Sequence, residues 1–242
     1  MATLVVSRDA LANRAELEEF LHDITALDAP PDGFYVLVSS RGSDARSEMS
    51  NADVICGWLM INYSLKVNGF RVVNGFSDLL SPFLGAVGGD VGCTGWWSNL
   101  RTFSLERFVP SSTGGRLPVQ RYLSTSLLNR IRFDELNAWK RFSQNVVNRL
   151  PTDNIFIGLE DGEPERSMEV LQSWDALGAL MKTFSTRDVA SNLKSCSTGI
   201  ERANLLYDEL RAFGARPDPK SNDEHLEPLK EGIRLFRRIA EV

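Results

Sequence analysis

Histidine and cysteine are scarce in this sequence. Among 242 residues there are two histidines, His22 and His225, and three widely separated cysteines. No H-E-x-x-H, H-x-H or C-x-x-C spacing occurs, which argues against a zinc site and gives a Cys–His or Ser–His catalytic pair little support. The cysteines do not form the pattern of a disulfide framework, so a reducing, cytoplasmic location is the simpler prediction.

Long apolar runs and an excess of basic residues are also lacking. No run approaches the ~18 apolar residues that a membrane-spanning helix needs, and the N-terminal residues lack the pattern of a secretory signal peptide. The formal net charge is −5, whereas proteins that bind nucleic acid usually cluster Lys and Arg. We therefore expect no membrane partner and disfavour nucleic acid, although a short basic face near the C-terminus leaves an accessory role in nucleic-acid processing open. That face consists of Lys230, Arg234, Arg237 and Arg238.

The first hundred residues alternate between short β-branched runs and helical patterns. Strand-like runs occupy 3–7, 34–40, 70–76 and 89–97, and helical patterns occupy 8–27, 52–69 and 77–88. This order predicts four βα units that form a parallel sheet. Asn51 or Ser50 is expected to cap the second helical segment, and Ser77 the third.

The pattern changes beyond residue 104. A flexible loop is predicted at 110–118 (PSSTGGRLP), and apolar residues then recur mostly at helical spacing, with one further strand-like run at 154–158. One apolar stripe consists of Leu127, Leu128, Ile131, Leu136, Trp139, Phe142, Val146 and Leu150, and another of Val170, Leu171, Trp174, Leu177, Leu180, Met181 and Phe184. We therefore expect an α/β fold with a βα-repeat sheet at 1–109 and a mainly helical region at 119–242 that packs on the sheet or on a partner.

Over residues 3–104 this alternation resembles half of a (β/α)₈ barrel, a fold of roughly 250 residues when complete. The resemblance rests on alternation and spacing and points to no specific family, and a small doubly wound sheet has the same pattern. Three arrangements stay open: an open sheet under the C-terminal helices, two paired copies, or strands supplied by another chain. The half-barrel resemblance implies a binding or assembly protein that forms a homo-oligomer or joins a partner subunit.

Polar residues follow the second, third and fourth predicted strands, at the edge where parallel sheets usually bind ligands. An alternative function is therefore an enzyme that acts on a phosphorylated or otherwise anionic small molecule. In that interpretation Asp78 is the catalytic acid or base, and the ligand-binding residues are Arg41, Asn74, Thr94, Trp96, Asn99 and Arg101. A competing interpretation makes residues of this kind helix caps. Neither a cofactor nor a metal ion is predicted.

The segment FLGAVGGDVGCTGWWSNLRTFS (83–104) is rich in glycine but contains neither a Walker loop nor a G-x-G-x-x-G motif. Gly88 and Gly89 are better explained by a tight turn from helix to strand. Cys93 is predicted to be a small buried strand residue because no base or cation is expected beside it. If the strand continues, Trp96 and Trp97 point to opposite faces, so that one enters the core and the other reaches the rim.

Overall fold

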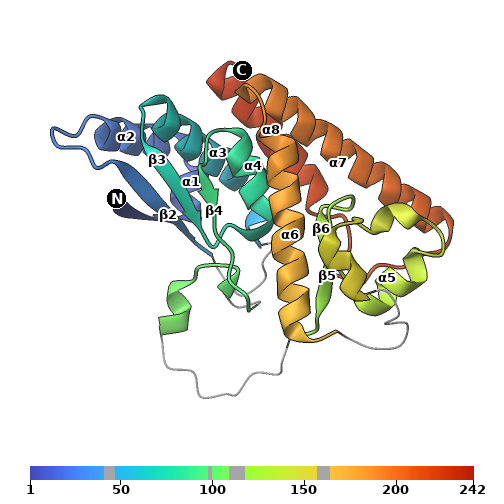
Figure 1. The fold of residues 1–242 in the computed structure, drawn as a ribbon. Coiled ribbons are helices and arrows are strands. Elements are labelled where there is room, and N and C mark those ends of the chain that lie inside the picture. Colours follow the sequence, from blue (N-terminus) through green and yellow to red (C-terminus); the bar gives the residue numbers. More distant parts are fainter. Residues whose placement is uncertain (41–46, 98–99, 109–117, 157–163) are drawn as a thin grey trace.

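A computed structural model describes residues 1–40, 47–97, 100–108, 118–156 and 164–242. The N-terminal half forms a parallel sheet whose strand order follows the chain, β1-β2-β3-β4 (Figure 1). The strands are β1 (Ala2–Ser7), β2 (Gly33–Ser39), β3 (Arg71–Gly75) and β4 (Val91–Gly92). The predicted α/β class with four parallel strands is thus confirmed. The last strand is shorter than the predicted run at 89–97 because its pairing with β3 stops at Gly92.

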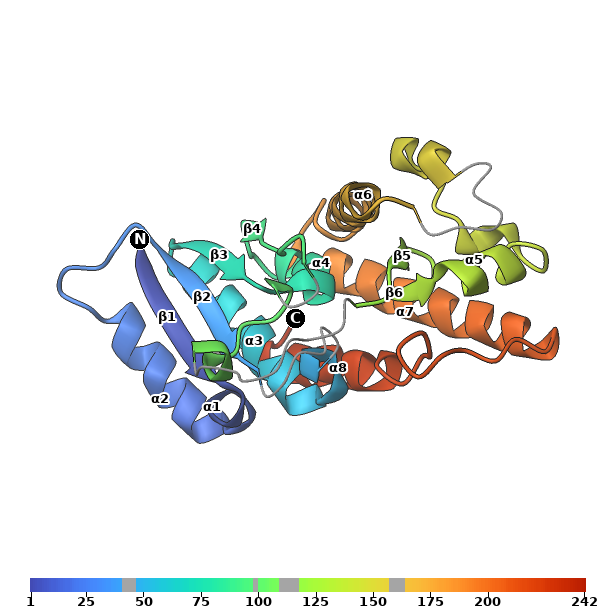
Figure 2. The same ribbon diagram turned by 90° about the horizontal axis from the view of Figure 1, so that it is seen from below.

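The helices that connect these strands lie on one side of the sheet. They are α1 (Arg8–Ala12), α2 (Arg14–Thr25), α3 (Ala52–Val67) and the short α4 (Ser81–Ala86). Figures 1 and 2 show α1, α2 and α3 behind the strands, and the opposite side of β1 and β2 is not covered by a helix of the described chain. Sequential strand order with right-handed crossovers has this result, because every crossover passes over the same face.

Local capping explains where two of these helices begin. The side chain of Asn51 accepts hydrogen bonds from the backbone N–H groups of Asp53 and Val54, at 2.9 and 3.1 Å, which confirms it as the N-cap of α3. The single helix predicted at 8–27 is wrong, because Asn13 leaves the helical conformation and caps α2. Ser77 was expected to cap a helix, but its hydroxyl bonds to Ser81 instead, at 2.7 Å.

The C-terminal half contains a hairpin that the sequence pattern did not predict. Strands β5 (Arg121–Ser124) and β6 (Asn129–Arg132) pair antiparallel, and α5 (Phe133–Trp139) follows directly. The expected helical stripe from Leu127 onward is therefore wrong in its first part. Its apolar residues are still buried, since the hairpin turn directs Leu127 and Leu128 into the core. Residues 154–156 belong to a 3₁₀ helix, Pro151–Phe156, rather than to a strand.

Three long helices complete the chain and join both halves into one hydrophobic core. They are α6 (Arg166–Phe184), α7 (Val189–Ala212) and α8 (Leu226–Ala240). Helix α8 packs closely on α3, where Gly232 lies against Ile55 and no larger residue would fit. Within the described ranges, none of the helices combines the length and apolarity needed to cross a bilayer.

Helix α6 buries a more polar face than its apolar spacing predicts. Leu171 and Trp174, both expected in the core, are exposed. Of the other predicted residues, Val170, Leu177, Leu180 and Phe184 are buried, and the buried side also carries Glu169, Gln172 and Ser173. The amide of Gln172 accepts a hydrogen bond from the N–H of Leu123 and donates one to its carbonyl oxygen, at 3.0 and 2.9 Å. Helix α6 therefore meets β5 through hydrogen bonds as well as through apolar packing.

Candidate functional site

A strained turn follows β3 at the carboxyl edge of the parallel sheet. Phe76 and Asp78 have φ angles of 56° and 39°, which non-glycine residues adopt at a cost of about 1–2 kcal/mol each. The turn is anchored to the end of β4, since the N–H of Ser77 donates to the carbonyl of Cys93 at 3.0 Å and the N–H of Cys93 donates to the carbonyl of Asn74 at 2.8 Å. Backbone strain of this kind concentrates at functional sites.

Asp78, the predicted catalytic residue, is buried and held by two partners. Its carboxylate accepts a bidentate pair of hydrogen bonds from the Arg130 guanidinium, at 2.5 and 2.8 Å. The hydroxyl of Thr94 donates to the same carboxylate at 2.7 Å. Two residues of the predicted site, Asp78 and Thr94, are therefore brought together, and Asp78 is joined to β6 of the C-terminal half.

A second buried ion pair lies beside the first. Arg101 donates to Glu169 of α6 at 3.2 Å, and both side chains are almost fully buried. Arg130 interacts electrostatically with both members of this pair. Burial lowers the pKa of the Arg130 guanidinium, the Asp78 carboxylate opposes that shift, and the nearby charge of Arg101 adds to it. Two arginines and two carboxylates form a charge cluster with no net charge, which we call the edge cluster (Asp78, Arg101, Arg130 and Glu169).

Three buried polar atoms, one in the edge cluster and two on segments that supply its residues, have no hydrogen-bond partner in the described part of the chain. They are Nε of Arg130, Oγ of Ser104 and Oγ of Ser173. Ser173 lies one helical turn after Glu169, and Ser104 lies three residues after Arg101. Buried polar groups are usually satisfied by protein or by ordered water. Within the edge cluster itself, Arg130 Nε is therefore a donor left for ordered water or a small polar ligand.

Asn74 is committed to the core behind the sheet. Its carbonyl oxygen accepts hydrogen bonds from Trp58 Nε1 at 2.9 Å and from the Asn62 amide at 3.0 Å, and its own amide donates to Asn62 at 2.6 Å. Trp58 and Asn62 are one turn apart on α3, so a single face of that helix meets Asn74. The structure thus places Asn74 in a polar network that joins β3 to α3, and its side chain does not reach the edge cluster.

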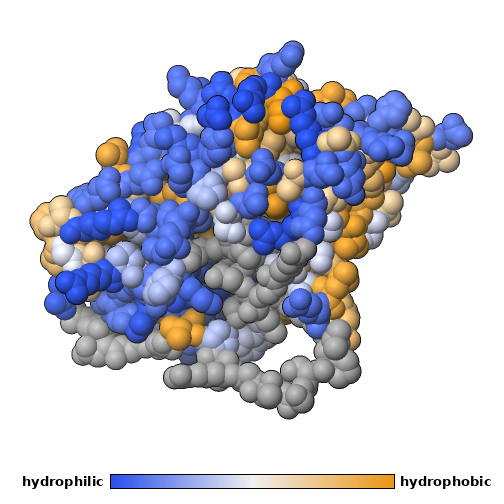
Figure 3. Space-filling model, turned by 180° about the vertical axis from the view of Figure 1, so that it is seen from behind, coloured by the Kyte–Doolittle hydropathy of each residue, from blue (hydrophilic) through white to orange (hydrophobic). Residues whose placement is uncertain are grey.

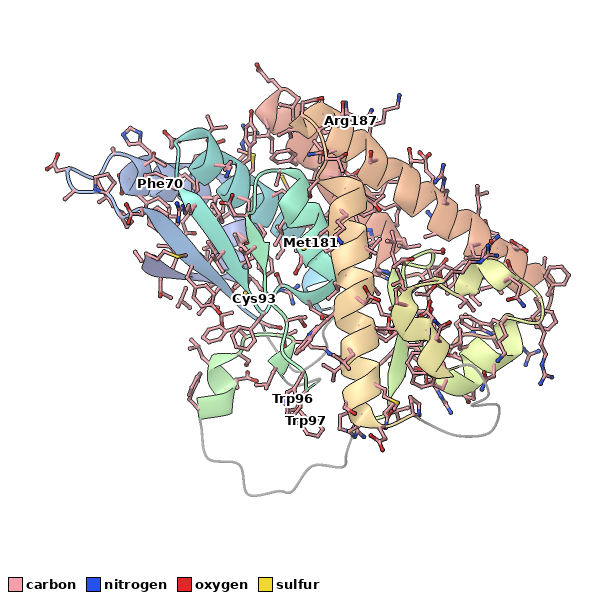
Figure 4. The ribbon with its side chains drawn as sticks, viewed as in Figure 1. Phe70, Cys93, Trp96, Trp97, Met181 and Arg187 are labelled. Carbon is pink, nitrogen blue, oxygen red and sulfur yellow. The ribbon has the colours of Figure 1, made fainter. Side chains whose placement is uncertain are left out.

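The tryptophan pair lies at the surface, beyond the end of β4 and near the lower end of α6 (Figure 4). Trp96 and Trp97 are 54% and 37% exposed, so neither enters the core as the strand alternation predicted. The rings meet edge to face at 5.8 Å, and the guanidinium of Arg166 lies 5.7 Å from the Trp97 ring centroid. The strand ends before these residues, which explains why their faces do not alternate.

Arg41 and Asn99, two further predicted ligand-binding residues, lie outside the described residues, as does all but the last residue of the loop predicted at 110–118. Arg130 and Glu169 were missed by sequence reasoning. The available signal was polar residues inside apolar stretches, Arg130 next to Ile131 and Glu169 next to Val170. A charge in such a position is expected to be paired if it is buried.

Cys93 lies between the strands and the tryptophan pair (Figure 4) and is half-buried. Burial raises the pKa of its thiol. Burial raises the pKa of the Tyr35 hydroxyl as well, and the nearby Cys93 thiol contributes to that shift. A raised pKa keeps the thiol protonated at neutral pH, which is the opposite of what a nucleophilic cysteine needs.

The sheet face opposite α1, α2 and α3 presents apolar side chains in register. Tyr35, Val73 and Val91 lie side by side on β2, β3 and β4, and Val5 lies beside Leu37 in the adjacent row. We call these five residues the open face. Val5 and Val91, on the two edge strands, are 52% and 47% exposed, whereas Leu37 is buried and the polar Thr3 lies beside Tyr35.

Comparison with known proteins found no matching family model, no matching curated protein and no matching solved structure.

Proposed function

We propose that this chain is a binding and assembly protein whose open face is covered by a second copy of itself. The observation that supports the proposal is the exposure of Val5 and Val91 on a parallel sheet. Parallel sheets are normally covered on both faces, because their strands are rich in apolar side chains on both sides. Here α1, α2 and α3 cover one face only, within the described chain (Figure 2).

The opposite side of the molecule differs in character. Viewed from behind, hydrophilic residues dominate most of the coloured surface, while hydrophobic residues gather along its right side (Figure 3). Further exposed apolar residues lie on the segment that begins at residue 100. Leu105 and Phe108, in the 3₁₀ helix Leu105–Phe108, are 57% and 76% exposed. Apolar surface gathered in this way is typical of a surface that another protein covers.

A second copy is the occupant that best fits the sheet. A twofold axis brings the same patch of two subunits together, so the apolar rows of the open face would meet identical rows. Two sheets pack face to face at about 10 Å, a distance that side chains of the size of valine, leucine and tyrosine fill. Two four-stranded sheets also supply the eight strands of the barrel that the first half resembles, although face-to-face packing does not require closure.

The oligomeric state tests this proposal. Sedimentation equilibrium at about 1–50 µM is expected to give a dimer for the unaltered chain. Val5→Lys places a charge on the proposed interface, on the edge strand β1, and is expected to raise the dimer dissociation constant at least about tenfold. Val67→Lys is the matched control, because Val67 is exposed at the end of α3 on the covered side. A strict monomer at all concentrations, or equal effects of the two substitutions, would contradict the proposal.

Catalysis at the carboxyl edge of the sheet is the second candidate function. It is favoured by the strained backbone of Phe76 and Asp78 and by the unpartnered Nε of Arg130. In that case Asp78 acts as acid or base and Arg101 holds the anionic group of a phosphorylated or otherwise anionic substrate. Asp78→Asn and Arg101→Ala are then expected to abolish the thermal shift given by a panel of phosphorylated small molecules while the melting temperature of the free protein changes little. Unfolding of both variants would instead assign these residues a structural role.

A further inference from the structure

A cavity of about 630 Å³ lies between the second half of α6, the first half of α7 and the turn between β5 and β6. It is separate from the open face, and none of its lining residues belongs to the edge cluster. In Figure 4, Arg187 marks its position, between the end of α6 and the start of α7. A volume of this size is within the range of small-molecule binding sites, roughly 300–1,000 Å³.

The cavity has an apolar lining on its inner side. Leu128 from the hairpin turn and Leu180 and Phe184 from α6 line it, and all three are buried. They belong to the hydrophobic core that holds the hairpin against α6 and α7. This side is therefore rigid and suits the ring or hydrocarbon part of a ligand.

The outer side of the cavity carries positive charge. Arg187, Lys194 and Arg202 line it, all three are exposed, and their side chains form no ion pair with any described residue. No aspartate or glutamate belongs to the described lining. The carboxylate of Asp188 is close in sequence but is engaged as the N-cap of α7, where it accepts hydrogen bonds from the N–H and the hydroxyl of Ser191 at 2.9 and 2.8 Å. In a chain with a net charge of −5, three cations without a carboxylate among them indicate an anionic ligand.

Hydroxyl groups complete the lining. Ser126 and Thr198 have no hydrogen-bond partner within the described ranges, so both can donate to a ligand. Thr183 and Ser195 donate to backbone carbonyls one turn earlier, at 2.9 and 3.1 Å, and keep their oxygens free to accept. Hydroxyls interspersed with Arg and Lys are a common lining for phosphate groups, which accept several hydrogen bonds at once.

We propose that this cavity binds an organic molecule that carries two or more adjacent phosphate groups. Lys194 and Arg202 are eight residues apart on α7, a rise of about 12 Å along the helix axis. A single phosphate group spans only part of that distance, whereas a di- or triphosphate chain can contact both cations. The apolar side formed by Leu128, Leu180 and Phe184 then takes the organic part. This inference is independent of the assembly proposed for the open face.

Calorimetric titration with ATP and with tripolyphosphate, both without magnesium, tests the proposal. ATP is expected to bind with a dissociation constant in the range of about 1–100 µM, and tripolyphosphate more weakly because it lacks an organic part. The double variant Lys194→Gln/Arg202→Gln is expected to weaken ATP binding about 100-fold, since each charged hydrogen bond contributes about tenfold. The matched control is Lys230→Gln/Arg238→Gln, which removes the same two residue types at the same spacing from the exposed side of α8.

Three results would overturn the inference. One is the absence of binding for both ATP and tripolyphosphate at 1 mM, a concentration about tenfold above the expected range. Another is equal weakening by the α7 and α8 double variants, which would indicate attraction by overall charge alone. The third, ATP binding no tighter than tripolyphosphate, would refute the role of the apolar side. Because the altered residues of α7 are exposed, the melting temperature of the unliganded variants is expected to stay within about 2 °C of the unaltered chain.

Discussion

Replacing Asp78 by asparagine tests whether the edge cluster holds the two halves of the protein together. Asparagine has the shape of aspartate and tolerates a positive φ, so the strained backbone at this position is retained. The substitution removes the negative charge that neutralises Arg130 and replaces one acceptor oxygen by an N–H₂ group, which cannot accept from the guanidinium. Arg130 would then be a buried cation whose Nε already has no partner in the described chain.

The expected cost follows from the burial of the pair. Breaking a buried ion pair by removing one partner typically destabilises a protein by about 3–5 kcal/mol, because the other charge stays buried without compensation. Since asparagine keeps one acceptor, we expect a value near the lower end, about 3 kcal/mol. That is a large part of the roughly 5–15 kcal/mol by which a protein is normally stable.

Urea unfolding followed by far-ultraviolet circular dichroism measures this loss. The matched control is Glu18→Gln, which breaks the exposed pair Arg14–Glu18 on α2, where the two charges are 2.7 Å apart. Exposed pairs of this kind contribute about 0.3–0.5 kcal/mol. The double variant Asp78→Asn/Arg130→Met is expected to be more stable than Asp78→Asn alone, because it removes the uncompensated cation as well.

A loss below about 1 kcal/mol for Asp78→Asn, similar to that of Glu18→Gln, would refute this reasoning. It would mean that the Arg130 charge is easily rehydrated, and it would favour the catalytic alternative for Asp78. A double variant less stable than Asp78→Asn would also contradict the argument, since the apolar side chain would then be worse than a buried, unpaired charge.

Further measurements address packing, thiols and pH. Gly57→Ala is expected to lower the unfolding free energy by about 1–3 kcal/mol, because its added Cβ would lie 2.2 Å from a backbone oxygen of α1. Gly178→Ala, in open space on α6, should raise the unfolding free energy by about 0.4–1 kcal/mol. Equal effects of the two substitutions in urea unfolding would contradict this. Burial raises the pKa of all three thiols, that of Cys56 to about 11. A thiol-reactive disulfide should therefore label the native protein slowly at pH 8 and label three thiols in denaturant. Rapid labelling of the native protein would contradict this prediction. Burial by itself would raise the pKa of Asp90, but hydrogen bonds from Lys66 and from a backbone N–H together lower it. The free energy of unfolding should therefore fall as the pH drops below about 4, and this fall should be smaller in Asp90→Asn.

Much of the N-terminal half follows from local sequence. Alternating β-branched runs and helical patterns specify β1, β2 and β3, because each segment has one strongly preferred conformation and the connections are short. Asn51 specifies the start of α3 in the same local way, since its side chain bonds to the N–H groups two and three residues ahead. The parallel direction of the strands then follows from the helical crossovers between them, which needs no information about distant contacts.

The β5–β6 hairpin and the face of α6 do not follow from local pattern. Apolar residues near the hairpin fit a helical stripe as well as a strand, and periodicity alone does not separate short apolar runs of this kind. Helix α6 turns two large apolar side chains outward, and on its buried side Gln172 bonds to Leu123, a residue 49 positions away in the chain. A hydrogen bond at that separation has no signature in the spacing of the helix.

Local sequence is enough to predict the α/β class, the four parallel strands and the residues that gather after β3 and β4, because these depend on conformational preference and on the direction of the strands. What those residues contact depends on how the two halves of the chain pack together. Asp78 and Arg101 are paired with Arg130 and Glu169, which lie 52 and 68 residues away in the chain. The cavity of Lys194 and Arg202 likewise forms only when α6, α7 and the hairpin pack together. Both the edge cluster and the cavity depend on long-range packing, which brings together residues that are far apart in the chain.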